Sequence, residues 1–201
     1  MSEKLVFNEK YHSYFLGKQF LPGVSSILKA AGLVSFEGIP EEILVRARDF
    51  GLACHKVCEL SDLDTLDMAT VDEPVIPYLT AWQKFKIDNA VEIEDIELPV
   101  FSEKWQYAGK LDRVVIMGGK RILLDIKSSA SIYPSMAIQL KGYEIAYNEM
   151  TGIKIQGRAI IQLLKTGAYN VCSCKDESDE QVFLAAIQIY RWKKKNNIGG
   201  K

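Results

Sequence analysis

Two aspartates and a lysine stand next to apolar runs in the middle of the chain. The segment from Gly109 to Lys127 reads GKLDRVVIMGGKRILLDIK and contains Asp112, Asp125 and Lys127. Its central pair, Gly118-Gly119, lies between two aliphatic runs and favours a β-hairpin with a two-residue turn. The pairing set by this turn places Asp112 opposite Asp125, with Cβ atoms roughly 5 Å apart. Because strand side chains alternate, Lys127 is expected on the same face as both aspartates.

This arrangement predicts a site for a divalent cation. Two neighbouring carboxylates inside an apolar sheet raise each other's pKa, and burial raises it further. A bound cation removes that conflict, and oxygen ligands favour a hard ion, Mg²⁺ or Mn²⁺. Lys127 could then hold a phosphate oxygen or orient a water. A surface hairpin with ordinary salt bridges is the alternative, but the runs VVIM and ILL, apolar on both faces, indicate a buried central hairpin.

Five short motifs occur in a fixed order along the chain. They are Gly51-Leu-Ala-Cys-His55, Glu97, Gly109-Lys-Leu-Asp112, Asp125-Ile-Lys127 and Gln139-Leu-Lys-Gly-Tyr143. Each motif is weak alone, but the ordered set resembles the PD-(D/E)XK nuclease superfamily, and within it the RecB-like and phage-type exonuclease branch. Glu92, Glu94 and Asp95 lie close to Glu97, so the sequence leaves the register of that motif open.

The resemblance implies a role for each matched residue. His55, Glu97, Asp112, Asp125 and the backbone carbonyl of Ile126 would bind Mg²⁺ or Mn²⁺. Lys127 would be catalytic, and Gln139 and Tyr143 would shape the site. The implied function is a metal-dependent deoxyribonuclease, an exonuclease that hydrolyses DNA phosphodiester bonds in recombination, repair or phage DNA processing. A restriction-type endonuclease, and a catalytically inactive nucleic-acid-binding domain of the same fold, are alternatives.

Composition and charge are those of an ordinary globular protein. The 201 residues are 48% hydrophobic and 25% charged, with a formal net charge of −1. We expect a single domain over 1–201, with an N-terminal extension over 1–32 and a core over 40–195. The chain has no overall excess of basic residues that would indicate nucleic-acid binding, so contact with DNA requires a local basic patch. The terminal run RWKKK, from residue 191, could contact phosphates or could be a solvated helix end.

The chain shows no apolar leader and no membrane-spanning stretch. We therefore expect a cytoplasmic protein without membrane contact; the sequence does not indicate its oligomeric state. Four cysteines lack the spacing of a zinc or redox motif and are interpreted as buried free thiols. A zinc or iron–sulfur protein is the alternative. These cysteines are Cys54, Cys58, Cys172 and Cys174.

The elements expected around the motifs predict an α/β fold, a mixed β-sheet flanked by helices in the order αβββαβ. A hairpin is expected within the first twenty residues, then a helix capped by Ser25 or Ser26. The remaining helices are expected from Pro40 to about Leu60, from Asp72 to about Asn89, from Pro134, and from about Ser178. The remaining strands are expected at 91–100, with a bulge near Asp95, at 155–164 and at 168–174.

Overall fold

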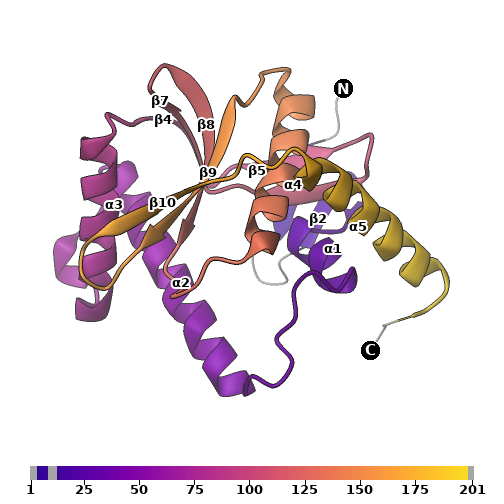
Figure 1. Ribbon diagram of the computed structural model, residues 1–201, viewed down its shortest axis with the longest axis horizontal. Helices are drawn as coiled ribbons and strands as arrows, with labels where there is room; N and C mark the ends of the chain where they lie inside the picture. The colour runs from indigo at the N-terminus through magenta and orange to yellow at the C-terminus, as the bar shows by residue number, and fades with distance from the viewer. Residues whose placement is uncertain (1–3, 9–12, 199–201) are drawn as a thin grey trace.

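The main β-sheet is mixed and carries helices on both faces (Figure 1), as expected. The structure is a computed structural model that describes residues 4–8 and 13–198. The sheet order is β10 (Tyr169–Ser173), β9 (Gly157–Leu163), β8 (Lys120–Lys127), β7 (Arg113–Met117) and β4 (Glu92–Ile96). β8 and β9 are parallel, and the other neighbours are antiparallel. The long helix α4 (Pro134–Thr151) makes the crossover between β8 and β9.

The helices divide between the two faces of this sheet. α3 (Ile76–Asp88) packs Trp82 and Phe85 against one face, together with Cys58 of α2 (Glu41–Asp62). α4, α1 (Val24–Ala30) and α5 (Ser178–Lys195) cover the other face (Figure 1). Two single-turn 3₁₀ helices, at Met68–Thr70 and Glu73–Val75, lead from α2 into α3. The chemically interesting residues of β8 therefore lie between two hydrophobic layers.

The β7–β8 hairpin has the expected turn and register. Gly118 and Gly119 have φ angles of 57° and 72°, which L side chains rarely adopt and which a primed two-residue turn requires. Pairing runs from Met117↔Lys120 to Arg113↔Leu124. Asp112 lies one residue beyond the last pair, in the bend that leads into β7. The register thus places Asp112 at the open end of the hairpin rather than inside its ladder.

The strand expected over 91–100 is two strands in two different sheets. β4 contains the expected bulge between Ile93 and Asp95. The chain then leaves the main sheet at Glu97, whose φ is +49°. β5 (Pro99–Ser102) instead pairs with β6 (Tyr107–Lys110) in a separate two-stranded sheet. The single-strand expectation was wrong because one left-handed residue redirects the backbone.

Two expectations about the N-terminal part also needed correction. The expected hairpin is a three-stranded sheet of β1 (Leu5–Asn8), β2 (Ser13–Leu16) and β3 (Gln19–Leu21), and the β1–β2 connection lies outside the described residues. The N-cap of α1 is Gly23, not Ser25 or Ser26. Gly23 has an extended backbone, and its carbonyl accepts the first helical hydrogen bond, from the Ile27 N–H at 3.0 Å. Both serines therefore lie within the helix.

The four cysteines fall into two pairs on opposite sides of the sheet. Cys54 and Cys58 are buried on α2, where Cys58 packs into the α3-side core. Cys172 and Cys174, on and just after β10, are half-buried and pack against the α4-side core. The sheet thus separates the pairs. In the described parts of the chain, no helix has the length and hydrophobicity needed to cross a membrane.

Candidate active site

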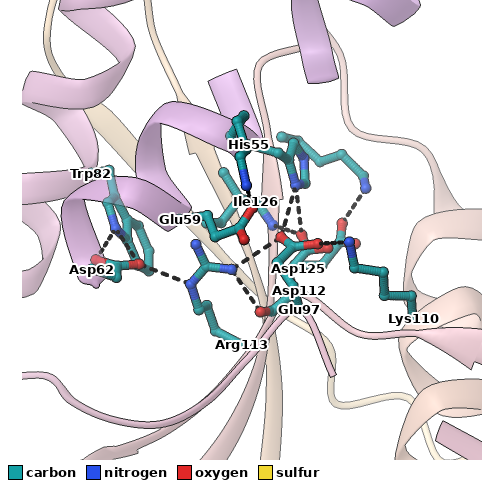
Figure 2. A network of polar contacts seen from close by, with 12 residues as sticks. His55, Glu59, Asp62, Trp82, Glu97, Lys110, Asp112, Arg113, Asp125 and Ile126 are labelled. Atoms are coloured by element: carbon teal, nitrogen blue, oxygen red, sulfur yellow. Dashed lines mark hydrogen bonds and ion pairs between the residues drawn. The ribbon is translucent and has the colours of Figure 1, made fainter. Parts of the chain in front are cut away.

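The candidate site forms at the open end of the hairpin, where β7 begins and β8 ends. Figure 2 shows His55 reaching from α2 toward carboxylates that come from the β4–β5 connection, the β6–β7 bend and β8. The ligand atoms of His55, Glu97 and Asp112 all lie within 4.8 Å of one another. Residues far apart in the sequence are therefore brought together at one point by the sheet and one helix.

Asp112 has contacts to three of these segments. Its Oδ2 accepts a 2.7 Å hydrogen bond from the Ile126 N–H, and it lies 3.5 Å from Nδ1 of His55. Its backbone carbonyl accepts from the Glu97 N–H at 2.8 Å. Since the N–H and C=O of a strand residue point to the same side, the Ile126 carbonyl also faces the Asp112 side of β8. Asp112 thus ties the bend, β8 and the β4–β5 connection together.

Glu97 is the acidic residue of its segment that faces the site. Its carboxylate lies 2.8 Å from Nζ of Lys110, 3.1 Å from Nη1 of Arg113 and 3.8 Å from Nδ1 of His55. Burial alone would raise its pKa, but the cationic groups of His55 and Lys110 outweigh burial and lower the pKa of Glu97 to about 2. Glu97 therefore stays ionised.

The neighbouring acids of β4 have other partners. Glu94 forms an ion pair with Arg121, and Asp95 accepts a hydrogen bond from the Tyr147 hydroxyl at 2.9 Å. Glu97 is therefore the acid of this segment that lies with His55 and Asp112. The left-handed backbone of Glu97, which costs on the order of 1 kcal/mol or more for a non-glycine residue, is held by three cationic neighbours.

Asp125, which is buried, and Lys127, which is half-buried, form an ion pair beside this cluster. Nζ of Lys127 lies 2.6 Å from Oδ2 of Asp125. The two groups are not aligned as a hydrogen bond, and within the described residues this oxygen accepts none. The pKa of Asp125 is raised to about 6, because burial and the nearby Asp112 raise it by more than Lys127 lowers it. Burial alone would lower the pKa of Lys127, but Asp125 and Asp112 raise it above its ordinary value, so Lys127 remains an ammonium.

The charge of His55 is set by the same carboxylates. Burial by itself lowers the pKa of this imidazole, but Asp112 and Glu97 raise it above its ordinary value. The two carboxylates therefore stabilise the imidazolium form of His55. A cation bound by the same carboxylates would take the place of that proton.

Tyr143 and Gln139 form the wall of the site on the α4 side. They lie one turn apart on one face of α4, and Nε2 of Gln139 donates a 2.8 Å hydrogen bond to the Tyr143 hydroxyl. Gln139 also lies 3.4 Å from Oγ of Ser25 on α1. Gly109 makes room for the Tyr143 ring, since a Cβ on Gly109 would lie 2.8 Å from Cδ1 of Tyr143 and closer still to Cε1.

We expect Gly109→Ala to destabilise the protein by about 1–3 kcal/mol, the range for overpacking a filled core, because the new methyl group would push Tyr143 out of place. Urea denaturation would measure the loss. Gly51→Ala is the matched control, because its Cβ would meet only Oγ of Ser128, at 3.9 Å. Gly51 lies inside a helix, so alanine should there be neutral or stabilise by up to about 1 kcal/mol. Equal effects of the two substitutions would contradict this account of Gly109.

A second network, largely buried, contacts Glu97 through Arg113 and was missed by the sequence analysis. The Arg113 guanidinium contacts Glu97 and also donates from Nε to Oδ2 of Asp62 at 2.8 Å. Asp62 further accepts from Nε1 of Trp82 at 2.9 Å and from Nζ of Lys86 at 2.6 Å (Figure 2 shows the first of these). An arginine directly before the run VVIM was the one available signal, since a charged residue at the start of a buried strand requires partners.

Comparisons with known proteins give weak similarities to solved structures, among them those of an alkaline exonuclease. No protein-family model and no curated protein sequence matches the chain. An alkaline exonuclease of Laribacter hongkongensis, LHK-Exo, is 11% identical over 88% of this chain and 93% of its own, with a TM-score of 0.38. The same enzyme in complex with dAMP gives 13% identity, the same coverages and a TM-score of 0.41. The structure of SSO0001 is 15% identical over 70% of this chain and 72% of its own, with a TM-score of 0.39. Similarities at these values establish neither a family nor a function.

Proposed function

We propose that the protein is a metal-dependent deoxyribonuclease, an exonuclease that hydrolyses DNA phosphodiester bonds with Mg²⁺ or Mn²⁺. The observation that carries the proposal is the convergence of His55, Glu97 and Asp112 within 4.8 Å, beside the Asp125–Lys127 pair. A purely structural role gives no reason for so many buried charges at one point, because each desolvated ion costs several kcal/mol unless it is paired.

The donor set fits a hard divalent cation. Glu97, Asp112 and the hydrogen-bond-free oxygen of Asp125 are carboxylate donors, and His55 adds one imidazole nitrogen. The pKa of Glu97, held near 2, keeps this ligand ready at neutral pH. The Ile126 carbonyl, on the side of β8 that faces Asp112, would complete the ligand set. When bound, the cation would lower the pKa of a water and neutralise charge on the phosphate.

The protein's own groups would divide the remaining work. The Ile126 N–H holds the Asp112 carboxylate in a single orientation. Lys127, kept charged by Asp125, would donate to the phosphate oxygen on which negative charge develops, or hold the attacking water. Gln139 and Tyr143 would orient the strand rather than move protons, because burial raises the pKa of the Tyr143 hydroxyl far above neutral. Each role is a consequence of where the side chain lies.

The proposal is tested by incubating end-labelled linear and circular DNA with the protein in Mg²⁺, Mn²⁺ or EDTA. Release of mononucleotides from linear DNA only, abolished by EDTA, is the expected result. Nicking or cutting of circular DNA would identify a restriction-type endonuclease instead. Binding without cleavage in either metal would identify an inactive DNA-binding domain. Asp112→Asn serves as the inactive control.

Metal affinity should rise with pH until both Asp125 and His55 have lost their protons. Asp125, with a pKa of about 6, is protonated below that pH, and His55 has a raised pKa. A cation must therefore displace protons from both residues in acid, which weakens binding by about tenfold per pH unit for each proton displaced. Calorimetric titration with Mn²⁺ between pH 5 and pH 8 measures the slope. Asp125→Asn should bind more weakly and with a shallower slope, and an unchanged slope would contradict the role of Asp125.

A further inference from the structure

A cationic surface lies on the side of the molecule formed by α1 and the end of α5. We call it the basic patch and define it by six exposed cations, Lys18, Lys29, Lys104, Arg191, Lys194 and Lys195. They come from four segments: the β2–β3 turn, the last turn of α1, the β5–β6 turn and the last turn of α5. In Figure 1, α1 and α5 lie side by side near the C-terminal end of the chain.

Specific contacts hold these segments together. Nη2 of Arg191 donates to the backbone carbonyl of Trp105 at 2.7 Å, which joins α5 to the β5–β6 turn. Nζ of Lys193 donates to the carbonyl of Ala30 at 2.7 Å, which joins α5 to the end of α1. The β2–β3 turn is joined through a hydrogen bond between Gln19 and Gln106. The basic patch is therefore one surface rather than six scattered charges.

The cations of the basic patch are not neutralised by the protein. Within the described residues, none of the six forms an ion pair, whereas Lys56, Lys84 and Arg121 elsewhere on the surface each pair with a carboxylate. Two acids lie next to Lys104. Glu103 is its exposed neighbour in the sequence, and Glu149 accepts a hydrogen bond from its backbone N–H. Helix-end electrostatics accounts for cations in the last turn of α5 but not for Lys18 or Lys104.

Aromatic rings are interleaved with these charges. Trp192 is 59% exposed and Phe20 is 45% exposed. Nζ of Lys194 lies 5.4 Å from the centre of the Phe20 ring, and Nζ of Lys104 lies 5.0 Å from that of Trp105. Exposed rings among unpaired cations are suited to single-stranded nucleic acid, whose phosphates meet the cations and whose bases stack on the rings.

Helix α1 sets the separation between the basic patch and the candidate active site. Ser25, in its first turn, contacts Gln139 of the site at 3.4 Å, and Ala30, at its end, contacts Lys193. At 1.5 Å rise per residue these points are about 8 Å apart along the helix. A DNA strand with its end at Gln139 and Tyr143 could therefore reach the basic patch within a few nucleotides.

We propose that the basic patch binds single-stranded DNA, as the part of the substrate strand that flanks the end held in the active site. This rests on the proposed nuclease function. It makes the preferred substrate a strand long enough to cover both α1 and the end of α5. The net charge of −1 does not argue against it, since the acidic cluster of the candidate site offsets the patch in the total.

Fluorescence anisotropy in EDTA tests the patch without cleavage. Lys194→Glu/Lys195→Glu is compared with Lys120→Glu/Lys154→Glu, which makes the same change in net charge at the β7–β8 turn and the α4–β9 connection. The first variant should bind a labelled strand of about 20 nucleotides roughly tenfold more weakly. For this variant, the slope of the logarithm of the binding constant against the logarithm of the salt concentration should become shallower by about 1.4. This is about 0.7 for each phosphate that is no longer neutralised. The control variant should stay within about twofold of the unmodified protein.

Two further measurements identify the ligand. Trp192→Ala should weaken binding of the same strand by about fivefold or more, as expected when one base no longer stacks on a ring, with a smaller effect on duplex DNA of equal length. A tetranucleotide should bind all variants alike. The proposal would be overturned if both charge-reversal variants lost strand binding equally or if neither lost it. It would also be overturned if Trp192→Ala had no effect on strand binding. The proposal would likewise be overturned if Lys194→Glu/Lys195→Glu lost binding to anionic lipid vesicles while its DNA binding stayed unchanged.

The outcomes for the patch and for the nuclease function can be told apart. A protein that binds the strand through the basic patch but cleaves no DNA in Mg²⁺ or Mn²⁺ would refute the nuclease proposal alone. A protein that cleaves DNA while Lys194→Glu/Lys195→Glu binds it normally would refute the patch alone.

Discussion

Asp112→Asn is expected to weaken Mn²⁺ binding by about 10²-fold or more and to abolish detectable DNA cleavage. The carboxylate is one of the three candidate ligand groups that lie within 4.8 Å of one another, and an amide would not supply its charge. Even loss of a group that only orients a ligand typically costs 10–100-fold in metal affinity. Calorimetry with Mn²⁺ and an assay of labelled DNA measure the two effects.

The same substitution should leave the fold intact. Asparagine keeps an oxygen that can accept from the Ile126 N–H, so we expect the free energy of unfolding to change by no more than about 1 kcal/mol. Thermal unfolding of the metal-free variant is the control. Unchanged Mn²⁺ affinity in a folded variant would remove Asp112 from the ligand set.

Lys127→Ala is expected to lower turnover by about 10²–10³-fold, the usual cost of removing one transition-state donor. As an ammonium, Lys127 cannot ligate a cation, so metal affinity at pH 8 should change little. The measurement must be made at that pH, because loss of the ammonium that lowers the pKa of Asp125 would increase proton competition in acid.

Lys110→Ala is the matched control for Lys127. Its Nζ lies 2.8 Å from Glu97, whereas Lys127 contacts Asp125. We therefore expect Lys110→Ala to affect metal affinity through Glu97 more than turnover at saturating metal. If Lys110→Ala rather than Lys127→Ala caused the large loss of turnover, the catalytic cation would have been assigned to the wrong lysine.

Features that depend on local backbone chemistry could be predicted from the sequence. Adjacent glycines determined the β7–β8 turn, and with it the register that brings Asp112 to Asp125. Pro134 marked the start of α4, and the change of phase near Asp95 marked the bulge. The positions of His55 and Glu97 beside Asp112 were predicted through an ordered set of motifs, because no local pattern places a helix over an open hairpin end.

Features that depend on long-range partners could not be predicted. The positive φ of Glu97 is tolerated because Lys110, Arg113 and His55 surround its carboxylate, and these residues come from three other elements. The split of one expected strand into β4 and β5 follows from that residue. The buried Asp62–Arg113 pair likewise becomes visible only when α2 is packed on β7. In each case tertiary contacts decided against the local signal.

The pair Asp62–Arg113 has a consequence for how the protein folds. It joins the last turn of α2 to the first residue of β7, while Trp82 and Lys86 of α3 contact the same carboxylate. No one of these elements can satisfy its buried charge alone, so partly folded states that lack one of them leave an ion unpaired in the core. Helices and hairpin should therefore become native together, which makes the assembly of the Glu97 environment cooperative and disfavours compact states in which that environment is incomplete.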